Sequence, residues 1–340
     1  MSPLKPQLMD VLAARARLAP QRVVLPESVE GDILRAARSA LDRGVALPVL
    51  LGDSEAVGQA AARAGVDLVG MEIIDIEDDG LCAELGDSAA SVFPEMSRKR
   101  IDKRLQNPLA VASLLVACGR ADAMVAGLRH TTQEVILAAA GFIPLADGVS
   151  KPYSMFLMRI PGYEGPEGET IVFADCGVTI NPDASQLAEI AILAARAAQR
   201  LFDWEPRVAL LSFSTKASGY DDSVKKVREA LSIVREREPS LAIDGELQLD
   251  AAIVPAIAAR KAPGERWVAG RANILVFPDL NAGNIAYKCV QRFAKADAFG
   301  PFFLGLQKTA SDLSRGSSVA DILGVITLAS IQAQDMKRRP

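Results

Sequence analysis

The sequence predicts an α/β protein of two domains, on the evidence of its length, its residue usage and its alternation of segments. The chain has 340 residues, more than the roughly 250–300 at which a single hydrophobic core usually stops growing. Half of the residues are hydrophobic and few are aromatic, which suits parallel sheets covered by alanine-rich helices. Short β-branched segments alternate with longer helical ones, a pattern typical of parallel strands joined by crossover helices.

The first half of the chain shows this alternation of expected strands and helices. In residues 32–44 the apolar positions Ile33, Leu34, Ala37 and Leu41 recur at helical spacing before Gly44, which predicts a helix ended by glycine. By the same reasoning we expect strands at 22–26, 48–51, 72–75 and 123–126, and helices at 54–64 and 108–118. The basic segment 98–104 is interpreted as a solvated helix face.

The pattern changes near residue 150. Residues 154–159 and 170–175 flank a Gly/Pro-rich segment at 161–168, which predicts a β-hairpin. The alternation then resumes, with helices expected at 185–201, 223–236, 249–260, 283–293 and 318–334 and strands at 207–212 and 274–277. We place domain I at 1–148 plus 301–340 and domain II at 149–300, with a cleft between them.

Composition excludes several classes of protein. A net charge of −4 provides no electrostatic reason to expect nucleic acid or an anionic membrane as a partner. Cys82, Cys118, Cys176 and Cys289 are scattered, which disfavours a zinc site or disulfides and suits a reducing cytoplasm. Residues 1–20 lack the apolar core of a secretion signal. The longest apolar run, 109–118, is far shorter than the ~20 residues that span a bilayer.

Motifs exclude further chemistries. The chain has one histidine, His130, and lacks a G-x-S-x-G elbow, a P-loop and a G-x-G-x-x-G fingerprint, so a hydrolase triad and the usual nucleotide sites are not predicted. Hydroxyl, Arg, Asn and Asp residues instead gather at strand-to-helix junctions, where open α/β sheets bind ligands. Such groups can hold phosphate at helix N-termini without a metal.

Three junctions have this composition: residues 130–132, 212–219 and 313–318. Ser318 and Asp321 have the spacing of a helix capping box, so a structural cap and a catalytic carboxylate both remain open for Asp321. For His130, a structural role and a ligand-binding role both remain open. The segment 277–284 contains Asp279, Asn281 and Asn284. Their side chains are either helix caps or ligand contacts.

Several long motifs together carry a resemblance to a known family. Residues 173–184 (FADCGVTINPDA), 186–190, 207–215, 244–252, 277–285 (FPDLNAGNI) and 312–322 (DLSRGSSVADI) closely resemble phosphate acetyltransferases of the phosphate acetyl/butyryltransferase family, in order and spacing. The resemblance covers the chain from about residue 120 to its end.

The resemblance implies two α/β/α domains with mainly parallel sheets, an interdomain active-site cleft as in isocitrate/isopropylmalate dehydrogenase-like folds, and a homodimer. It implies reversible acetyl transfer between acetyl phosphate and coenzyme A (CoA) in a ternary complex, with no metal required. Asp321 would be the base for the thiol, Arg315 the contact to phosphate and carbonyl oxygen, and Ser314 a donor to the tetrahedral centre. The substrate contacts implied or considered are His130, Thr131, Thr132, Ser214, Thr215, Asn281 and Asn284.

The chain departs from the family pattern at three places. Leu137 stands where members commonly have Arg, Pro152 and Tyr153 replace a typical Ser-Gly-Val run, and Ser317 replaces a frequent Cys. The first two departures bear on acyl or CoA contacts, whereas the mechanism needs no enzyme thiol. Alternatives are therefore a phosphate butyryltransferase, a non-catalytic regulatory or oligomerisation module, and a metal-dependent decarboxylating dehydrogenase, which the missing nucleotide and metal motifs disfavour.

Overall fold

The computed structural model describes residues 8–264 and 267–338, and the chain divides into two compact units. Unit 1 comprises Met1–Asp147 and Leu306–Pro340, and unit 2 comprises Gly148–Gly305. The return to the first unit that the sequence placed near residue 300 falls inside strand β10 (Asp297–Leu304), which lies in unit 2. The chain re-enters unit 1 after this strand ends.

The strands of unit 1 are parallel and follow the order β3-β2-β1-β4-β11. Their bounds are β1 Gln21–Leu25, β2 Ala46–Leu51, β3 Glu72–Ile74, β4 Ala123–Ala126 and β11 Thr309–Asp312. The last strand comes from the C-terminal segment and pairs with β4 in register Asp312↔Ala126. Because the strands are parallel, their carboxyl ends meet at one edge of the sheet.

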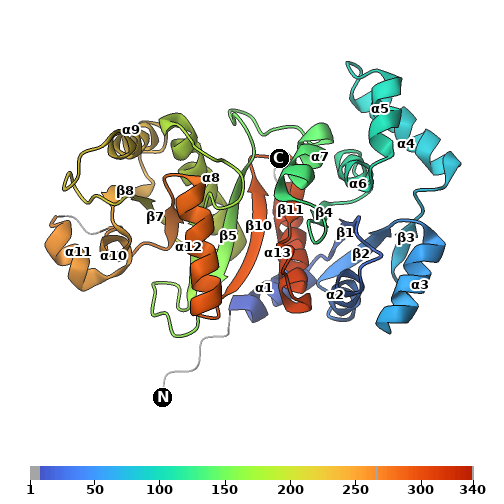
Figure 1. Ribbon diagram of the computed structural model, residues 1–340, viewed down its shortest axis with the longest axis horizontal. Helices are drawn as coiled ribbons and strands as arrows, with labels where there is room; N and C mark the ends of the chain where they lie inside the picture. Colours follow the sequence, from blue (N-terminus) through green and yellow to red (C-terminus); the bar gives the residue numbers. More distant parts are fainter. Residues whose placement is uncertain (1–7, 265–266, 339–340) are drawn as a thin grey trace. The chain divides into compact units, whose positions relative to one another are not determined.

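Helices cover both faces of the unit 1 sheet. One face carries α1 (Leu8–Arg17), α2 (Gly31–Asp42), α3 (Ser54–Ala64) and α13 (Val319–Lys337), and the other carries α4 (Asp79–Val92), α5 (Arg98–Leu105), α6 (Pro108–Ala117) and α7 (Thr132–Phe142) (Figure 1). Helix α6 is buried from Leu109 to Val116, as its continuous apolar run predicts. Unit 1 is therefore a three-layer α/β/α structure.

The strands of unit 2 follow the order β10-β5-β6-β9-β7-β8. Besides β10, their bounds are β5 Tyr153–Arg159, β6 Thr170–Ala174, β7 Arg207–Leu211, β8 Ala242–Leu247 and β9 Ile274–Val276. The predicted hairpin is confirmed, because β5 and β6 pair antiparallel on either side of the Gly/Pro-rich turn. Strand β10 is also antiparallel to β5, and the remaining pairs are parallel.

Helices also cover both faces of the unit 2 sheet. The pair α8 (Ala184–Phe202) and α9 (Asp222–Arg237) packs on one face, and α10 (Leu249–Ile253), α11 (Pro255–Lys261) and α12 (Leu280–Phe293) lie on the other (Figure 1). In the core between α12 and the sheet, the rings of Phe156 and Tyr287 stack with centroids 4.4 Å apart. The α/β/α fold class predicted for both domains is thus confirmed.

The single helix expected at 249–260 is wrong, since the segment forms α10 and α11. Val254 between them has an extended backbone, with φ −109° and ψ 108°. Pro255 cannot donate a helical N–H and its ring disfavours the helical conformation at the preceding residue. The proline therefore ends one helix and occupies the first turn of the next.

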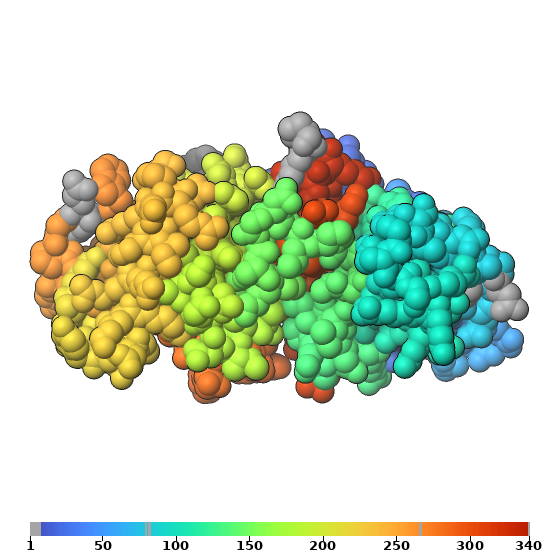
Figure 2. Space-filling model, turned by 90° about the horizontal axis from the view of Figure 1, so that it is seen from above, coloured from blue at the N-terminus to red at the C-terminus, as the bar shows by residue number. Residues whose placement is uncertain are grey.

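The basic segment lies in α5, where the solvated-face interpretation is confirmed. Lys99, Arg100 and Lys103 are exposed, whereas Ile101 and Leu105 are buried. The segment around residue 100, coloured cyan, lies at the molecular surface in Figure 2. Its charged side chains therefore lie on the solvent-facing side of α5.

The N-terminal residues 8–17 form the helix α1, and residues 1–7 of the segment examined for a secretion signal lie outside the described part. Cys118, Cys176 and Cys289 carry free thiols. The side chain of Cys82 is outside the described set. Within the described ranges, no helix is both long and apolar enough to span a membrane.

Candidate active site

The carboxyl edge of the unit 1 sheet collects most of the side chains predicted to be functional. Glu27 follows β1, His130 and Thr131 follow β4, and Ser314 and Arg315 follow β11. These three strands are neighbours in the order β1-β4-β11. Segments about 100 and 180 residues apart in the chain therefore meet at one edge.

A buried carboxylate organises the loop after β4. Glu27, 5% exposed, accepts the N–H groups of residues 127–130 at 2.9, 2.8, 2.8 and 3.2 Å. Its Oε1 also lies 2.8 Å from Nδ1 of His130. Since four N–H groups already donate to this carboxylate, Nδ1 carries the proton and donates as well. Glu27 thus fixes the His130 ring and leaves Nε2 directed elsewhere.

Helix α7 begins directly after this loop with a capping box. Thr131 Oγ1 accepts the Glu134 N–H at 3.3 Å, and Glu134 Oε2 accepts the Thr131 N–H at 2.7 Å. The next residue, Thr132, donates from Oγ1 to Asp312 Oδ2 at 2.5 Å. The helix N-terminus is therefore tied both to its own first turn and to the end of β11.

Helix α13 begins with a second capping box, at the predicted spacing. Ser318 Oγ accepts the Asp321 N–H at 3.2 Å, and Asp321 Oδ2 accepts the N–H and O–H of Ser318 at 2.9 and 2.8 Å. The structural role considered for Asp321 is therefore present. It occupies one carboxylate oxygen, and the catalytic role remains a proposal.

Arg315 is the exposed cation of the β11–α13 loop. Among the described residues its guanidinium has no ion-pair partner within 4 Å. Two hydrogen bonds from Thr131 are the main cause of the lowered pKa of Glu134, and the charges of His130 and Arg315 add to it. Arg315 therefore acts electrostatically at the N-terminus of α7. Ser314, half-buried, lies directly before it and accepts the Gly316 N–H at 3.4 Å.

In unit 2, Ser214 and Thr215 lie in the loop after β7. Ser214 is fully buried, donates to Glu246 Oε1 at 2.9 Å and accepts the Gly219 N–H at 3.0 Å. Thr215 is 4% exposed, and its Oγ1 accepts the Gln248 N–H at 2.9 Å. Both hydroxyls thus have protein partners that stabilise this loop, and their predicted substrate contacts remain proposals.

Asn281 and Asn284 lie in the first turns of α12. Asp279 is the cap of this helix, accepting the Ala282 N–H at 2.9 Å, so the capping role considered for it is present. Asn284 donates to the Cys176 carbonyl at 3.0 Å, and Asn281 is exposed. Asn281 is therefore the asparagine of the pair that presents its side chain to solvent.

Sequence reasoning missed four buried acidic residues at strand ends. Glu27 and Asp312 belong to unit 1, and Asp175 and Glu246 belong to unit 2; all are at most 5% exposed. Asp175 accepts the N–H groups of residues 177–179 at 3.0 to 3.1 Å. For Glu27 and Asp175, an acidic residue within two positions of a predicted strand end is the signal that could have found them, since buried charges need such partners. Asp312 and Glu246 lie in strands that the sequence did not predict.

The departures from the family pattern occupy different surroundings. Leu137 is 64% exposed on α7. Tyr153 is fully buried in β5 and donates to Glu189 Oε2 at 2.7 Å, and burial raises the pKa of its hydroxyl. Ser317 is half-buried beside Arg315. Tyr153 is therefore a core residue of unit 2.

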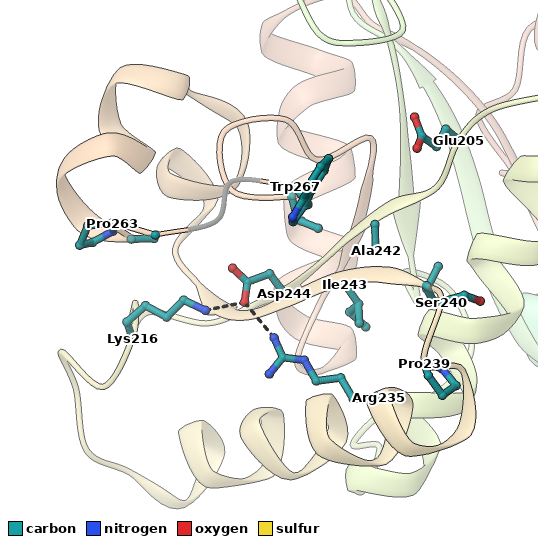
Figure 3. Close-up of a pocket in the computed structure, with 14 residues that line it drawn as sticks. Glu205, Lys216, Arg235, Pro239, Ser240, Ala242, Ile243, Asp244, Pro263 and Trp267 are labelled. Carbon is teal, nitrogen blue, oxygen red and sulfur yellow. Dashed lines mark hydrogen bonds and ion pairs between the residues drawn. The ribbon is translucent and has the colours of Figure 1, made fainter.

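A separate cavity of about 760 Å³ lies along the β8 edge of unit 2 (Figure 3). Asp244 projects into it and is engaged by Lys216 and, at 3.8 Å, by Arg235. Among the described residues that line it, none is a predicted catalytic or substrate-binding residue. Nor do the described residues contain a cluster of three or more His, Cys, Asp or Glu side chains suited to a metal ion.

Comparison with known proteins adds independent findings. The phosphate acetyl/butaryl transferase family model matches residues 7–330. A phosphate acetyltransferase from Acetivibrio thermocellus is 39% identical over 335 residues, covering 97% of this chain and 99% of the relative. A phosphotransacetylase structure from Streptococcus pyogenes is 38% identical, with a TM-score of 0.88, covering 96% of this chain and 98% of that one.

A branched-chain phosphotransacylase from Enterococcus faecalis, 19% identical with a TM-score of 0.67, covers 92% of this chain and 99% of its own and shares the fold. The family match extends over nearly all of both units, and the identity to the curated relative is far above what a shared fold alone requires. The chain therefore belongs to the phosphate acetyl/butaryl transferase family.

Proposed function

We propose that this protein is a phosphate acetyltransferase, which moves an acetyl group reversibly between acetyl phosphate and the thiol of CoA. The observation that carries the proposal is Arg315, an exposed guanidinium three residues before the cap of α13, whose charge also acts on Glu134 in the first turn of α7. A guanidinium fork and helix N-termini together are suited to phosphate. Family membership and the relatives named as phosphate acetyltransferases support the choice of reaction.

In the proposed complex, the phosphoryl group lies near the N-terminus of α7, where Thr131 and Thr132 begin the helix. Unpaired N–H groups and the positive end of the helix dipole favour an anion there. His130, held by Glu27 through Nδ1, directly precedes Thr131, and its Nε2 is proposed as a further contact to the ligand. The contacts of Ser214 and Thr215 with phosphate or CoA are proposed from the resemblance, and those of Asn281 and Asn284 from their position at a strand-to-helix junction.

The proposed chemical step is direct attack by sulfur. Asp321 takes the proton of the CoA thiol, a C–S bond forms at the acetyl carbonyl carbon, and the C–O bond to phosphate breaks, releasing inorganic phosphate. Arg315 and Ser314 donate to the oxygen that becomes negative in the tetrahedral transition state. Such preorganised donors are usually the largest single contribution to catalysis.

The free energy of thiol deprotonation explains why Asp321 needs Arg315. An ordinary thiol and an ordinary carboxyl differ in pKa by about 4.6 units, so proton transfer between them is unfavourable by roughly 6 kcal/mol. A neighbouring guanidinium stabilises the thiolate. Exclusion of water on substrate binding strengthens that interaction.

The experiment is thioester formation from acetyl phosphate and CoA by the purified protein. Arg315→Ala is expected to lower kcat/KM by about 100-fold or more, because one lost oxyanion donor has an effect of that order. The matched control is Arg35→Ala, which removes an exposed arginine of α2 paired with Asp32 and should keep wild-type turnover. Absence of turnover in a folded wild-type protein would contradict the proposal and favour the non-catalytic module.

Two further experiments test the acyl preference and the role of Asp321 as the base. Butyryl phosphate in place of acetyl phosphate ranks the acyl preference, and faster turnover with it would assign a phosphate butyryltransferase. Asp321→Asn keeps a capping oxygen but cannot accept the thiol proton; near-normal kcat in this variant would remove Asp321 from the base role.

We also propose that the enzyme is a homodimer in the cytoplasm. The resemblance supports the dimer, and the scattered cysteines support a reducing compartment. Sedimentation equilibrium of the purified chain tests the dimer, and a monomer at micromolar concentration would contradict it.

A further inference from the structure

Asp312, the last residue of β11, is a buried acid to which the proposed mechanism assigns no part. It is 0% exposed, and its Oδ2 accepts from Thr132 Oγ1 at 2.5 Å. Among the described residues, Oδ1 has no hydrogen-bond partner. It faces the backbone of Gly127, where even a Cβ atom would lie 1.9 Å from it. A buried carboxyl group with one oxygen left without a hydrogen bond is costly when it is ionised.

The surroundings of Asp312 favour its neutral form. Burial raises the pKa of Asp312 to about 7, and the nearby Glu27 charge also raises it, while the Thr132 hydroxyl and the Leu313 N–H act in the opposite direction. The Glu27 carboxylate is held by the loop N–H groups and by His130. Glu27 is thus the charged group that acts on Asp312, and the titratable His130 is bonded to Glu27.

The protonation state of Asp312 decides what Thr132 can do, because a hydroxyl has a single proton. When Asp312 is ionised, Thr132 must donate to it and can only accept from any other group. When Asp312 is protonated, the acid can donate to Thr132 Oγ1, and the hydroxyl proton is free to turn away. Thr132 is the first residue of α7 and is only half-buried, so the freed proton can reach a ligand at the helix N-terminus.

We propose that Asp312 is a positioning residue that donates its proton to Thr132 and thereby makes the Thr132 hydroxyl a hydrogen-bond donor to the phosphoryl group. Phosphate oxygens are acceptors, so an ionised Asp312 would leave Thr132 with an oxygen facing an oxygen. Phosphate binding and protonation of Asp312 are then linked. The inference rests on the proposed function for the identity of the phosphoryl ligand, and it involves no covalent step.

The kinetic test is the KM for acetyl phosphate from about pH 6 to about pH 9, at saturating CoA. In the wild type, KM is expected to rise up to tenfold per pH unit above about pH 7, the slope of one ionisation. Asp312→Asn keeps the shape and donates permanently from its amide, so its KM should stay low and lack this rise. Thr132→Val should have a raised KM that also lacks it, and kcat should change less than KM in both variants.

A binding measurement separates this inference from the proposed function. Calorimetry of inorganic phosphate binding at about pH 8, in two buffers of different ionisation enthalpy, counts the protons taken up. The wild type is expected to take up about one proton more per phosphate than Asp312→Asn or Thr132→Val, because phosphate and a proton on Asp312 would bind together. Measuring this difference does not require turnover, so the inference is tested independently of acetyl transfer.

Two outcomes would overturn the inference. One is equal proton uptake by the wild type and Asp312→Asn. The other is a wild-type rise of KM with pH that persists in Thr132→Val, which decides the matter if Asp312→Asn does not fold. A merely structural role of Asp312 would change stability and leave both readouts as they are in the wild type.

Discussion

At the scale of single residues, Gly127 makes the close approach of the loops after β4 and β11 possible. Its φ is +112°, a backbone conformation that residues with a side chain rarely adopt. An added Cβ would lie 1.9 Å from Asp312 Oδ1 and 2.8 Å from the Leu313 nitrogen, distances at which one of the loops must move. The glycine thus lets Asp312 lie directly against the amides that bind Glu27.

Gly127→Ala is therefore expected to lower the free energy of unfolding by about 2 kcal/mol or more, through the combined strain and clash. Gly58→Ala is the matched control, because Gly58 is in the interior of α3 and its added Cβ would meet nothing within 4 Å. That change should be neutral or stabilising by about 0.5–1 kcal/mol. Urea unfolding of both variants measures the difference, and equal stability of the two would contradict the steric argument.

The residues of this site differ in how well the sequence predicted them. Ser318 and Asp321 have a spacing that local geometry fixes, and their capping box is confirmed. Glu27 and Asp312 derive their surroundings from residues 100 and 180 positions away, which no local pattern encodes. Their burial depends on which strands become neighbours, and that is decided by the packing of the whole unit.

At the scale of elements, helices α7, α8 and α13 each begin with a complete capping box. In α7 and α13 the box lies at the carboxyl edge of the unit 1 sheet, where the proposed phosphate and thiol contacts are. The carboxylate of Asp321 then takes part in the cap of α13 and is also the proposed catalytic base. A cap at such a position fixes the direction of the helix and the rotamer of the carboxylate together.

Ser318→Ala should separate these two effects. It removes the cap of α13, so the free energy of unfolding is expected to fall by about 1 kcal/mol. It also removes the hydroxyl that holds Asp321, so kcat should fall several-fold. The matched control is Asp53→Ala, which removes the α3 cap to the Ala56 N–H and should cost a similar stability with unchanged kcat. An equal kcat in the two variants would mean that the cap does not position Asp321.

Elements were predictable where apolar periodicity was strong. Helices α3 and α9 and strands β1, β2 and β4 lie within two residues of their expected bounds. The missed strands β8, β10 and β11 carry polar residues or a Gly-Pro pair, as in Ala-Ile-Asp-Gly-Glu-Leu and Thr-Ala-Ser-Asp. These strands form because neighbouring strands offer pairing partners, and tertiary context overrides weak local propensity there.

At the scale of the whole molecule, each unit contains a buried acid whose protonation contributes to stability, with opposite signs. The pKa of Asp312 in unit 1 is raised to about 7, chiefly by burial. In unit 2, burial opposes ionisation of Glu246, but hydrogen bonds from Ala217 and Ser214 prevail and lower its pKa. The two units should therefore respond differently to pH.

For Asp312, the folded state binds a proton more tightly than the unfolded state, whose carboxyl titrates near 4. Its contribution to stability is full below about pH 4 and is lost as the pH rises through about 7. For Glu246 the folded state binds the proton more weakly. Its contribution is present above the ordinary Glu pKa, near 4.3, and is lost as the pH falls through its lower folded value.

Hydrogen exchange resolved by unit can measure both contributions, with each variant compared with the wild type at the same pH. Asp312→Asn should increase the protection of β4 and β11 relative to the wild type more at about pH 8.5 than at about pH 6, since each pKa unit is equivalent to roughly 1.4 kcal/mol. Glu246→Gln should reduce the protection of β7 and β8 at neutral pH and approach the wild type below about pH 4. Relative effects independent of pH would mean that these acids have the same protonation in the folded and unfolded states, and the donor role proposed for Asp312 at Thr132 would lose its energetic basis.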